Sequence, residues 1–173
     1  SEEEKVKIKK KHGTNQAILE APQRIRRVSM DIIKHYQDYI KPNGFKGMIV
    51  TSSRKAAIIY KEQFDKLGGP KSAVIISSDH NDGQEFNEYT DKAKHKNQIE
   101  DFKKPLGTGE GQSDLSFLIV KDMLLTGFNA PIAQVMYVDR KLTDHTLLQA
   151  IARVNRTNKN KFRGYIIDYY GLS

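Results

Sequence analysis

The chain has 173 residues, enough for one domain with a sizeable core, and carries 29 lysines and arginines against 21 aspartates and glutamates. The net charge of +8 is compatible with a polyanionic partner such as nucleic acid, although many unrelated basic proteins share such an excess. Cysteine is absent, which excludes disulfides and thiolate metal sites and favours an intracellular protein.

Residues 1–20 begin with a block of acid followed by a block of base, "SEEEKVKIKKKHG". With few apolar side chains to bury, this segment is expected to be a solvated, charged tail or linker ahead of a domain spanning 21–173. Because the chain starts at Ser1 rather than Met, we expect a fragment of a longer protein. No apolar run reaches the roughly 18 residues of a membrane span, and no signal peptide is evident.

From Ala21 to about Lys41, apolar residues recur at three- and four-residue steps, which predicts an amphipathic helix. The turn "KPNGFKG" and a short buried strand, "MIVTS", follow. A second helix is expected from Arg54 to Leu67, where a Gly-Gly-Pro sequence ends it.

Four further apolar runs have the length and composition of strands: "SAVIISS", "FLIVKD", "AQVMYVDR" and "GYIIDYYG". Their alternation with helical segments predicts a doubly wound α/β domain with a mainly parallel sheet of at least five strands. A long polar segment, 79–114, separates the second and third strands. It contains an expected helix near Asp91 to Phe102 and a Gly-rich end that we expect to be mobile.

Ligands of open parallel sheets bind beyond the carboxyl ends of the strands, so the residues that follow each strand are candidates for a site. The first strand leads into "TSSR", where hydroxyls meet the start of a helix whose free N–H groups suit a phosphate. The alternative is that Ser52 or Ser53 only caps that helix.

The third strand leads into "KDMLLTGFNAP". Thr126 and Gly127 could bring backbone close to a sugar-phosphate chain, and Asn129 could bind a ribose hydroxyl. The alternative for this stretch is an ordinary turn built from Gly, Asn and Pro.

The segment "LLQAIARVNRT" places two arginines and a glutamine in an otherwise apolar helix. At 100° per residue, Gln149, Arg153 and Arg156 fall within roughly 60° of one another. The opposite side carries Leu147, Ile151 and Val154. Two guanidinium groups one turn apart, without an acid four residues away, suit an anion with several oxygens, such as the γ-phosphate of a nucleotide. The alternative is a pair of solvated surface arginines.

The remaining candidates are weaker. Asp79, His80 and Asp82 are close together, but consecutive polar residues are more typical of a loop than of a metal site, and no histidine pair has ligand spacing. The sequence "GTGEG" lacks the strand and helix that flank a dinucleotide-binding turn. We therefore expect no metal site.

In this order, "LIVKDMLLTGFNAP", "MYVDRKLTDHTLLQAIARVNRT" and "IIDYYG" resemble motifs V and VI of superfamily 2 helicases, and most closely the motor (R) subunit of type I restriction-modification enzymes. The stretch "KGMIVTSSRKAAIIYKEQF" resembles the motif IV region. The similarity runs from about Ala21 to Leu172.

The resemblance implies a second RecA-like lobe, which pairs with a first lobe of the same chain to bind ATP and duplex DNA. Arg153 and Arg156 would be arginine fingers at the γ-phosphate, and Gln149 would couple that site to DNA. Gly127 and Asn129 would lie near the nucleotide. The residues expected at the DNA backbone are Thr51, Ser53, Arg54 and Thr126.

The sequence also departs from the family pattern. Asn129 stands where the family usually has Asp, and neither a G-x-x-x-x-G-K-[ST] phosphate loop nor an acidic magnesium motif is present. ATP and Mg²⁺ would be bound mainly by the first lobe, so the chain alone is expected to be inactive.

The implied function is ATP-dependent DNA translocation before DNA cleavage in a bacterial or archaeal cytoplasm, together with methyltransferase and specificity subunits. Two alternatives remain: the second lobe of another superfamily 2 DNA or RNA helicase, and a stand-alone nucleic-acid-binding module.

Overall fold

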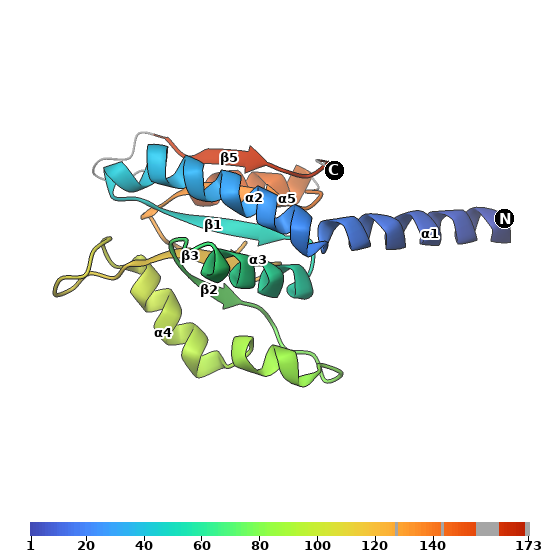
Figure 1. The fold of residues 1–173 in the computed structure, drawn as a ribbon, viewed down its shortest axis with the longest axis horizontal. Coiled ribbons are helices and arrows are strands. Elements are labelled where there is room, and N and C mark those ends of the chain that lie inside the picture. Colours follow the sequence, from blue (N-terminus) through green and yellow to red (C-terminus); the bar gives the residue numbers. More distant parts are fainter. Residues whose placement is uncertain (127, 143, 155–162, 172–173) are drawn as a thin grey trace.

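A computed structural model describes residues 1–126, 128–142, 144–154 and 163–171, with the backbone alone at residues 144, 146, 147, 151 and 153 (Figure 1). Its helices are α1 (Glu2–Leu19), α2 (Pro22–His35), α3 (Arg54–Lys66), α4 (Lys92–Lys103) and α5 (Asp144–Val154). Its strands are β1 (Lys46–Thr51), β2 (Lys71–Ile75), β3 (Leu115–Val120), β4 (Ala133–Asp139) and β5 (Tyr165–Asp168).

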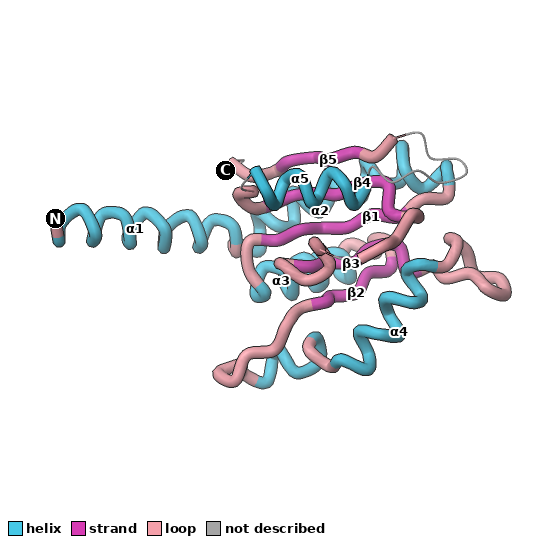
Figure 2. The backbone as a smooth tube through the Cα atoms, turned by 180° about the vertical axis from the view of Figure 1, so that it is seen from behind, coloured by secondary structure: helices cyan, strands magenta, loops and turns pink. Residues whose placement is uncertain are grey.

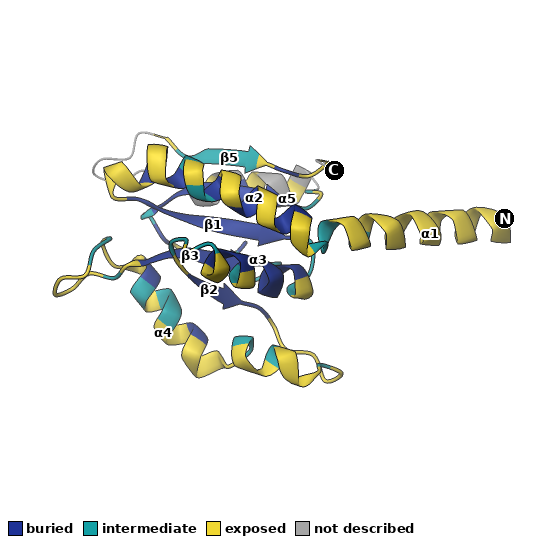
Figure 3. Cartoon of the chain, viewed as in Figure 1, coloured by how far each residue is buried: buried dark blue, intermediate teal, exposed yellow. Residues whose placement is uncertain are grey.

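The five strands form one sheet in the order β2-β3-β1-β4-β5, and every neighbouring pair is parallel. All six residues of β1 are buried (Figure 3), and so are all seven of β4, as expected for strands covered on both faces. The predicted doubly wound α/β architecture is confirmed.

Helices cover both faces of the sheet. On one face, α2 and α3 pack against alternate strand residues such as Ile49 and Phe117. On the other, α5 and the loop after β3 pack against the intervening residues, such as Met48 and Leu118 (Figure 2). Phe102 of α4 belongs to this second core. The alternation is a direct result of the two-residue period of strand side chains.

The predicted elements agree with the structure except at their ends. Helix α2 continues as a π-helical turn, Tyr36–Ile40, and a 3₁₀ turn, Lys41–Asn43, which ends at Gly44 with φ +80°. A 3₁₀ helix, Gln84–Tyr89, precedes α4 and was not predicted. The Gly-rich end of the polar segment folds back on itself through a bridge between Leu106 and Ser113.

Residues 2–19, expected only to be a charged tail or linker, form an 18-residue helix, α1. This helix has no buried residue and projects away from the sheet (Figures 1 and 3). Ser1 and Glu4 form a capping box at its start. None of the helices in the described ranges is long and apolar enough to cross a membrane.

A buried ion pair joins α2 to the carboxyl end of β4. Both guanidinium nitrogens of Arg24 donate to the Asp139 carboxylate at 2.8 Å, and Arg24 Nη2 also donates to the Tyr169 carbonyl at 3.1 Å. The Tyr60 hydroxyl of α3 donates to Asp139 at 2.6 Å. Arg24 and Asp139 are 5% and 2% exposed, so each depends on the other for its charge compensation.

A second buried cation fastens α4 to the sheet. Lys46, at the start of β1, is fully buried, and its Nζ donates to the carbonyls of Phe102 at 3.1 Å and Asp101 at 3.4 Å. These carbonyls belong to the last turn of α4, where a positive charge is favourable. Burial nevertheless lowers the pKa of Lys46 to about 8, with partial opposition from Asp101 and Asp114.

Candidate functional site

The segment after β1 is arranged by internal hydrogen bonds. Thr51 is fully buried, and its hydroxyl, which has one hydrogen to donate, lies within hydrogen-bond distance of the carbonyls of Val120 (3.0 Å) and Ser53 (2.9 Å). Ser53 Oγ accepts from the N–H of Ala56 at 3.0 Å, which confirms the capping alternative for this residue. The expected DNA contact by Thr51 is corrected, because its side chain presents no surface.

Arg54 lies at the first position of α3 and is clamped by the segment that follows β2. Its two terminal nitrogens donate to the Asp82 carboxylate at 2.7 and 2.6 Å, and Nη1 also reaches the Ser77 carbonyl at 3.0 Å. The guanidinium lies 4.6 Å from the Phe86 ring centroid. The ion pair with Arg54 lowers the pKa of Asp82. The side chain of Arg54 is 22% exposed, so part of it remains accessible at the carboxyl edge of the sheet.

The loop from 121 to 132 is pinned by apolar side chains. Leu125, Phe128 and Ala130 are buried in the core beneath it, whereas Thr126 and Asn129 are exposed. Gly127 lies outside the described residues. Leu124 has a φ of +68°, a left-handed conformation that costs a non-glycine residue of the order of 1 kcal/mol.

Helix α5 packs on β4 and β5 through its apolar side. Ala150 and Val154 are each 1% exposed, while Leu148 and Ala152 face outward. The burial of Val154 agrees with the predicted apolar side, while the side chains of Leu147 and Ile151, expected on the same side, lie outside the described residues. Gln149 is half-buried, and its Nε2 lies 2.9 Å from Nε2 of His145, one turn earlier. The side chain of Arg153 and the whole of Arg156 lie outside the described residues.

The predicted site residues that the structure describes form two groups. Helix α5 leaves the carboxyl end of β4 and returns to the start of the parallel strand β5, so it runs back along one face of the sheet. The 121–132 loop crosses the same face, because its buried side chains share a core with those of α5. Asn129 and Gln149 therefore lie over that face, whereas Ser53 and Arg54 lie at the carboxyl edge of the sheet, at the start of α3.

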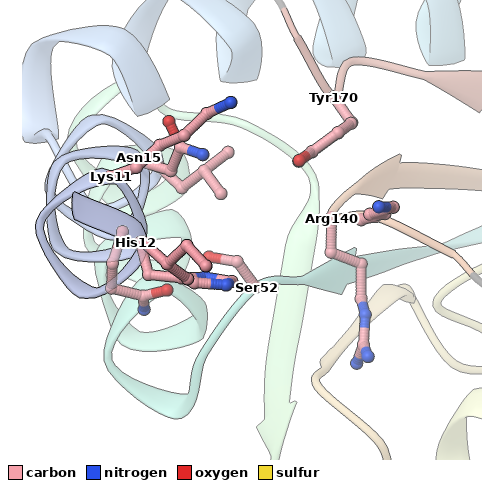
Figure 4. A pocket seen from close by; sticks show the side chains of 10 residues that line it. Lys11, His12, Asn15, Ser52, Arg140 and Tyr170 are labelled. Atoms are coloured by element: carbon pink, nitrogen blue, oxygen red, sulfur yellow. The ribbon is translucent and has the colours of Figure 1, made fainter. Parts of the chain in front are cut away.

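A groove not expected from the sequence lies between α1 and this carboxyl edge (Figure 4). Its volume is about 480 Å³, and its polar lining includes Lys11 and His12 from α1 and Ser52, Arg140 and Lys141 from the edge. Arg140 and Lys141 directly follow β4, so the rule applied to β1 and β3 would have found them. The contribution of α1 depends on tertiary packing and had no signal in the sequence.

Arg140 also ties two strand ends together. Its Nη1 donates to the Lys121 carbonyl at 3.0 Å and to Asp122 at 2.6 Å. Burial acts to raise the pKa of Asp122, but the hydrogen bond from Arg140 and the charge of Lys121 hold it below its ordinary value. Within the described ranges, no group of three or more His, Asp or Glu residues is placed to hold a metal ion.

Residues 78–171 match the family model for domain 3 of the type I restriction enzyme R subunit. This chain belongs to the family of type I restriction enzyme R subunits. The matched segment contains the 121–132 loop, α5, and the residues Arg140 and Lys141 that follow β4. It contains neither α1 nor the "TSSR" segment.

Two R-subunit relatives show the extent of the likeness. A Methanocaldococcus jannaschii protein, named as the MjaIXP endonuclease subunit of a type I restriction enzyme, is 37% identical over 174 residues, covering 99% of this chain and 16% of the relative. The HindI endonuclease subunit of a type I restriction enzyme from Haemophilus influenzae is 31% identical over 169 residues, covering 90% of this chain and 16% of the relative. The chain thus spans 16% of the length of either relative.

Solved structures agree on the fold. An HsdR subunit fragment of a type I restriction enzyme from Vibrio vulnificus superposes with a TM-score of 0.59 at 16% identity, over 88% of this chain and 28% of that one. The C-terminal part of the Fun30 ATPase domain superposes with a TM-score of 0.58 at 17% identity, over 84% of this chain and 42% of that one. The R-subunit domain therefore has the RecA-like fold that the resemblance implied.

Proposed function

We propose that this R-subunit domain, residues 21–173, is the second lobe of an ATP-dependent DNA translocase that acts before DNA cleavage, with residues 1–20 as a linker. The observation that carries the proposal is the orientation of α5. Ala150 and Val154 anchor the helix on the sheet, which leaves the Gln149 side of the helix available to a facing lobe.

The described residues fit one side of a nucleotide site. Thr126 and Asn129 are held outward by buried neighbours on the face that also carries Gln149. Amide side chains can bind ribose hydroxyls, and Asn129 would do so without the charge of the usual Asp. A phosphate loop is absent from the sequence, and the described ranges lack a carboxylate cluster for Mg²⁺. ATP and Mg²⁺ would therefore be held mainly by a first lobe.

In this arrangement Arg153 and Arg156 are arginine fingers. Bound ATP would supply the phosphoryl group, and the guanidinium groups would stabilise the negative charge that develops on its oxygens during transfer. The partners of the intact R subunit would be duplex DNA and the methyltransferase and specificity subunits. The relatives are named as restriction enzyme endonuclease subunits, which favours this function over another superfamily 2 helicase or a stand-alone binding module.

The decisive variant is Arg156→Ala in the full-length R subunit that contains this domain. DNA-stimulated ATP hydrolysis is expected to fall about a thousandfold or more, while nucleotide affinity changes little, because a finger acts mainly in the transition state. Turnover and nucleotide binding are measured side by side. Arg27→Ala, which removes an exposed arginine from α2 on the other face, is the matched control. Wild-type turnover in Arg156→Ala would refute the finger assignment.

The 173-residue chain gives a second test. Alone, it is expected to hydrolyse no ATP. Hydrolysis that persists after both Arg153 and Arg156 are replaced by alanine would contradict the two-lobe proposal.

A further inference from the structure

The groove between α1 and the carboxyl edge has two walls from distant parts of the chain. Residues of α1 that line it, from Ile8 to Leu19, recur at three- and four-residue steps and so share one face of the helix. The opposite wall is made by Ser52, Arg140, Lys141 and Tyr170 (Figure 4). The groove therefore forms only when these distant segments are brought together by folding.

The lining of the groove is basic. Among its ten described lining residues are two lysines, an arginine and a histidine, and none is acidic. Arg140 is partly neutralised by Asp122. Lys11 and Lys141 are exposed, and within the described ranges neither forms an ion pair. The acids of α1 at residues 2–4 lie in its first turn, away from the lining residues.

The cations are arranged in a row rather than converging on one point. Lys7 precedes Lys11 by one turn on the same face of α1, about 6 Å along the helix axis, and Lys141 lies across the groove. A compact anion would need its partners gathered around it, whereas a polymer with regularly spaced phosphates can meet cations along both walls.

Ser52 supplies an independent observation. Its Oγ is buried and has no hydrogen-bond partner in the described part of the chain, which is unusual for a hydroxyl. Ser52 lines the groove beside Arg140 (Figure 4). A phosphate oxygen would be a suitable acceptor. Ser52 also directly precedes Ser53 and Arg54, so the groove continues the edge at which DNA contact was expected.

We propose that this groove holds the sugar-phosphate backbone of a DNA duplex, with Lys11 and Lys141 contacting phosphates from opposite walls and Ser52 donating a hydrogen bond from the same wall as Lys141. The choice of DNA rests on the proposed function. The proposal assigns a nucleic-acid contact to α1, a segment outside the matched family model.

The test measures binding of a fluorescent 20-base-pair duplex to the 173-residue chain by anisotropy over a series of salt concentrations. In Lys11→Gln/Lys141→Gln, the slope of log affinity against log salt should decrease by about 2, and affinity at 0.1 M salt should fall by about 10- to 60-fold. The control, Lys92→Gln/Lys96→Gln, removes the same charge from exposed positions on α4 and should retain most of the affinity and slope.

The variant Ser52→Ala shows whether the Ser52 hydroxyl binds DNA or only stabilises the fold. Because the Oγ has no internal partner, its loss should leave the melting temperature unchanged or higher, while DNA affinity falls by about fivefold. Circular dichroism of every variant checks that the fold is retained.

Equal affinities for the groove variant and the α4 control would overturn the proposal, and would be expected if an acidic protein segment occupied the groove instead. Failure of the wild-type chain to bind DNA would also overturn it. Neither result bears on the arginine fingers, which are tested separately by ATP hydrolysis in the full-length R subunit.

Discussion

Replacing Lys46 with Met should stabilise the chain at neutral pH and remove the pH dependence of stability that the lysine imposes. The pKa of this buried ammonium is lowered from 10.5 to about 8, with burial as the main cause. At about 1.4 kcal/mol per pH unit, the difference corresponds to roughly 3 kcal/mol for keeping the charge out of water. Below pH 8 both the folded and the unfolded chain are protonated, so the folded chain bears the whole cost.

Between pH 8 and 10.5 the folded chain releases the proton of Lys46 while the unfolded chain keeps it. Because the unfolded state then binds more protons, the contribution of Lys46 to stability rises with pH. Lys46→Met removes the charge but also the hydrogen bonds to the Phe102 and Asp101 carbonyls, a loss of about 1–2 kcal/mol. The net gain at pH 7 should therefore be about 1–2 kcal/mol, or roughly 2–8 °C in melting temperature.

Urea denaturation of wild type and Lys46→Met at pH 7, 8, 9 and 10, followed by circular dichroism, measures the difference directly. The advantage of the variant should shrink, and by pH 10 become a disadvantage, through a change of about 2–3 kcal/mol. Lys71→Met, which removes an exposed lysine from β2, is the control and should show no such trend. A stability difference for Lys46→Met that stays constant from pH 7 to 10 would show that the buried lysine does not titrate as described.

Two further substitutions test the core. Asp139→Asn should lower the unfolding free energy by about 3–5 kcal/mol, because Arg24 keeps a buried charge without its carboxylate. If thermal denaturation shows that the unfolding free energy falls by less than about 1 kcal/mol, water must reach the Arg24–Asp139 ion pair. Gly47→Ala should destabilise by about 1–3 kcal/mol, since the added Cβ would lie 2.9 Å from Val135 Cγ1. Gly13→Ala, on α1 with open space around it, should instead stabilise slightly, and equal effects of the two would contradict the close packing at Gly47.

The strands could be predicted from the sequence because the pattern that identifies them is local. A strand buried on both faces needs a continuous apolar run, and "MIV" and "FLIV" are such runs. The cap at Ser53 is local as well, since its hydroxyl serves an N–H three residues away. The burial of Val154 on α5 follows from helical periodicity for the same reason.

What the sequence did not reveal depends on contacts between distant segments. Thr51 has the same polar character as Ser53, and only the approach of β3 to β1 shows that its hydroxyl is enclosed. The partner of Arg54 is Asp82, 28 residues later and beyond another strand. The groove requires α1 to lie beside residues that follow β4, and a charged helix without an apolar face carries no pattern that indicates where it will lie.

The ion pair between Arg24 and Asp139 has a consequence for synthesis on the ribosome. The two residues are 115 positions apart, and the Tyr169 carbonyl that completes the arrangement comes 30 residues later still. At roughly 5–20 residues per second, Arg24 waits about 6 to 23 seconds for its carboxylate to be made. During that interval α2 can dock on the nascent sheet only by burying an uncompensated guanidinium. Stable packing of α2 on this face is therefore expected only after Asp139 has been synthesised, when most of the domain is already present.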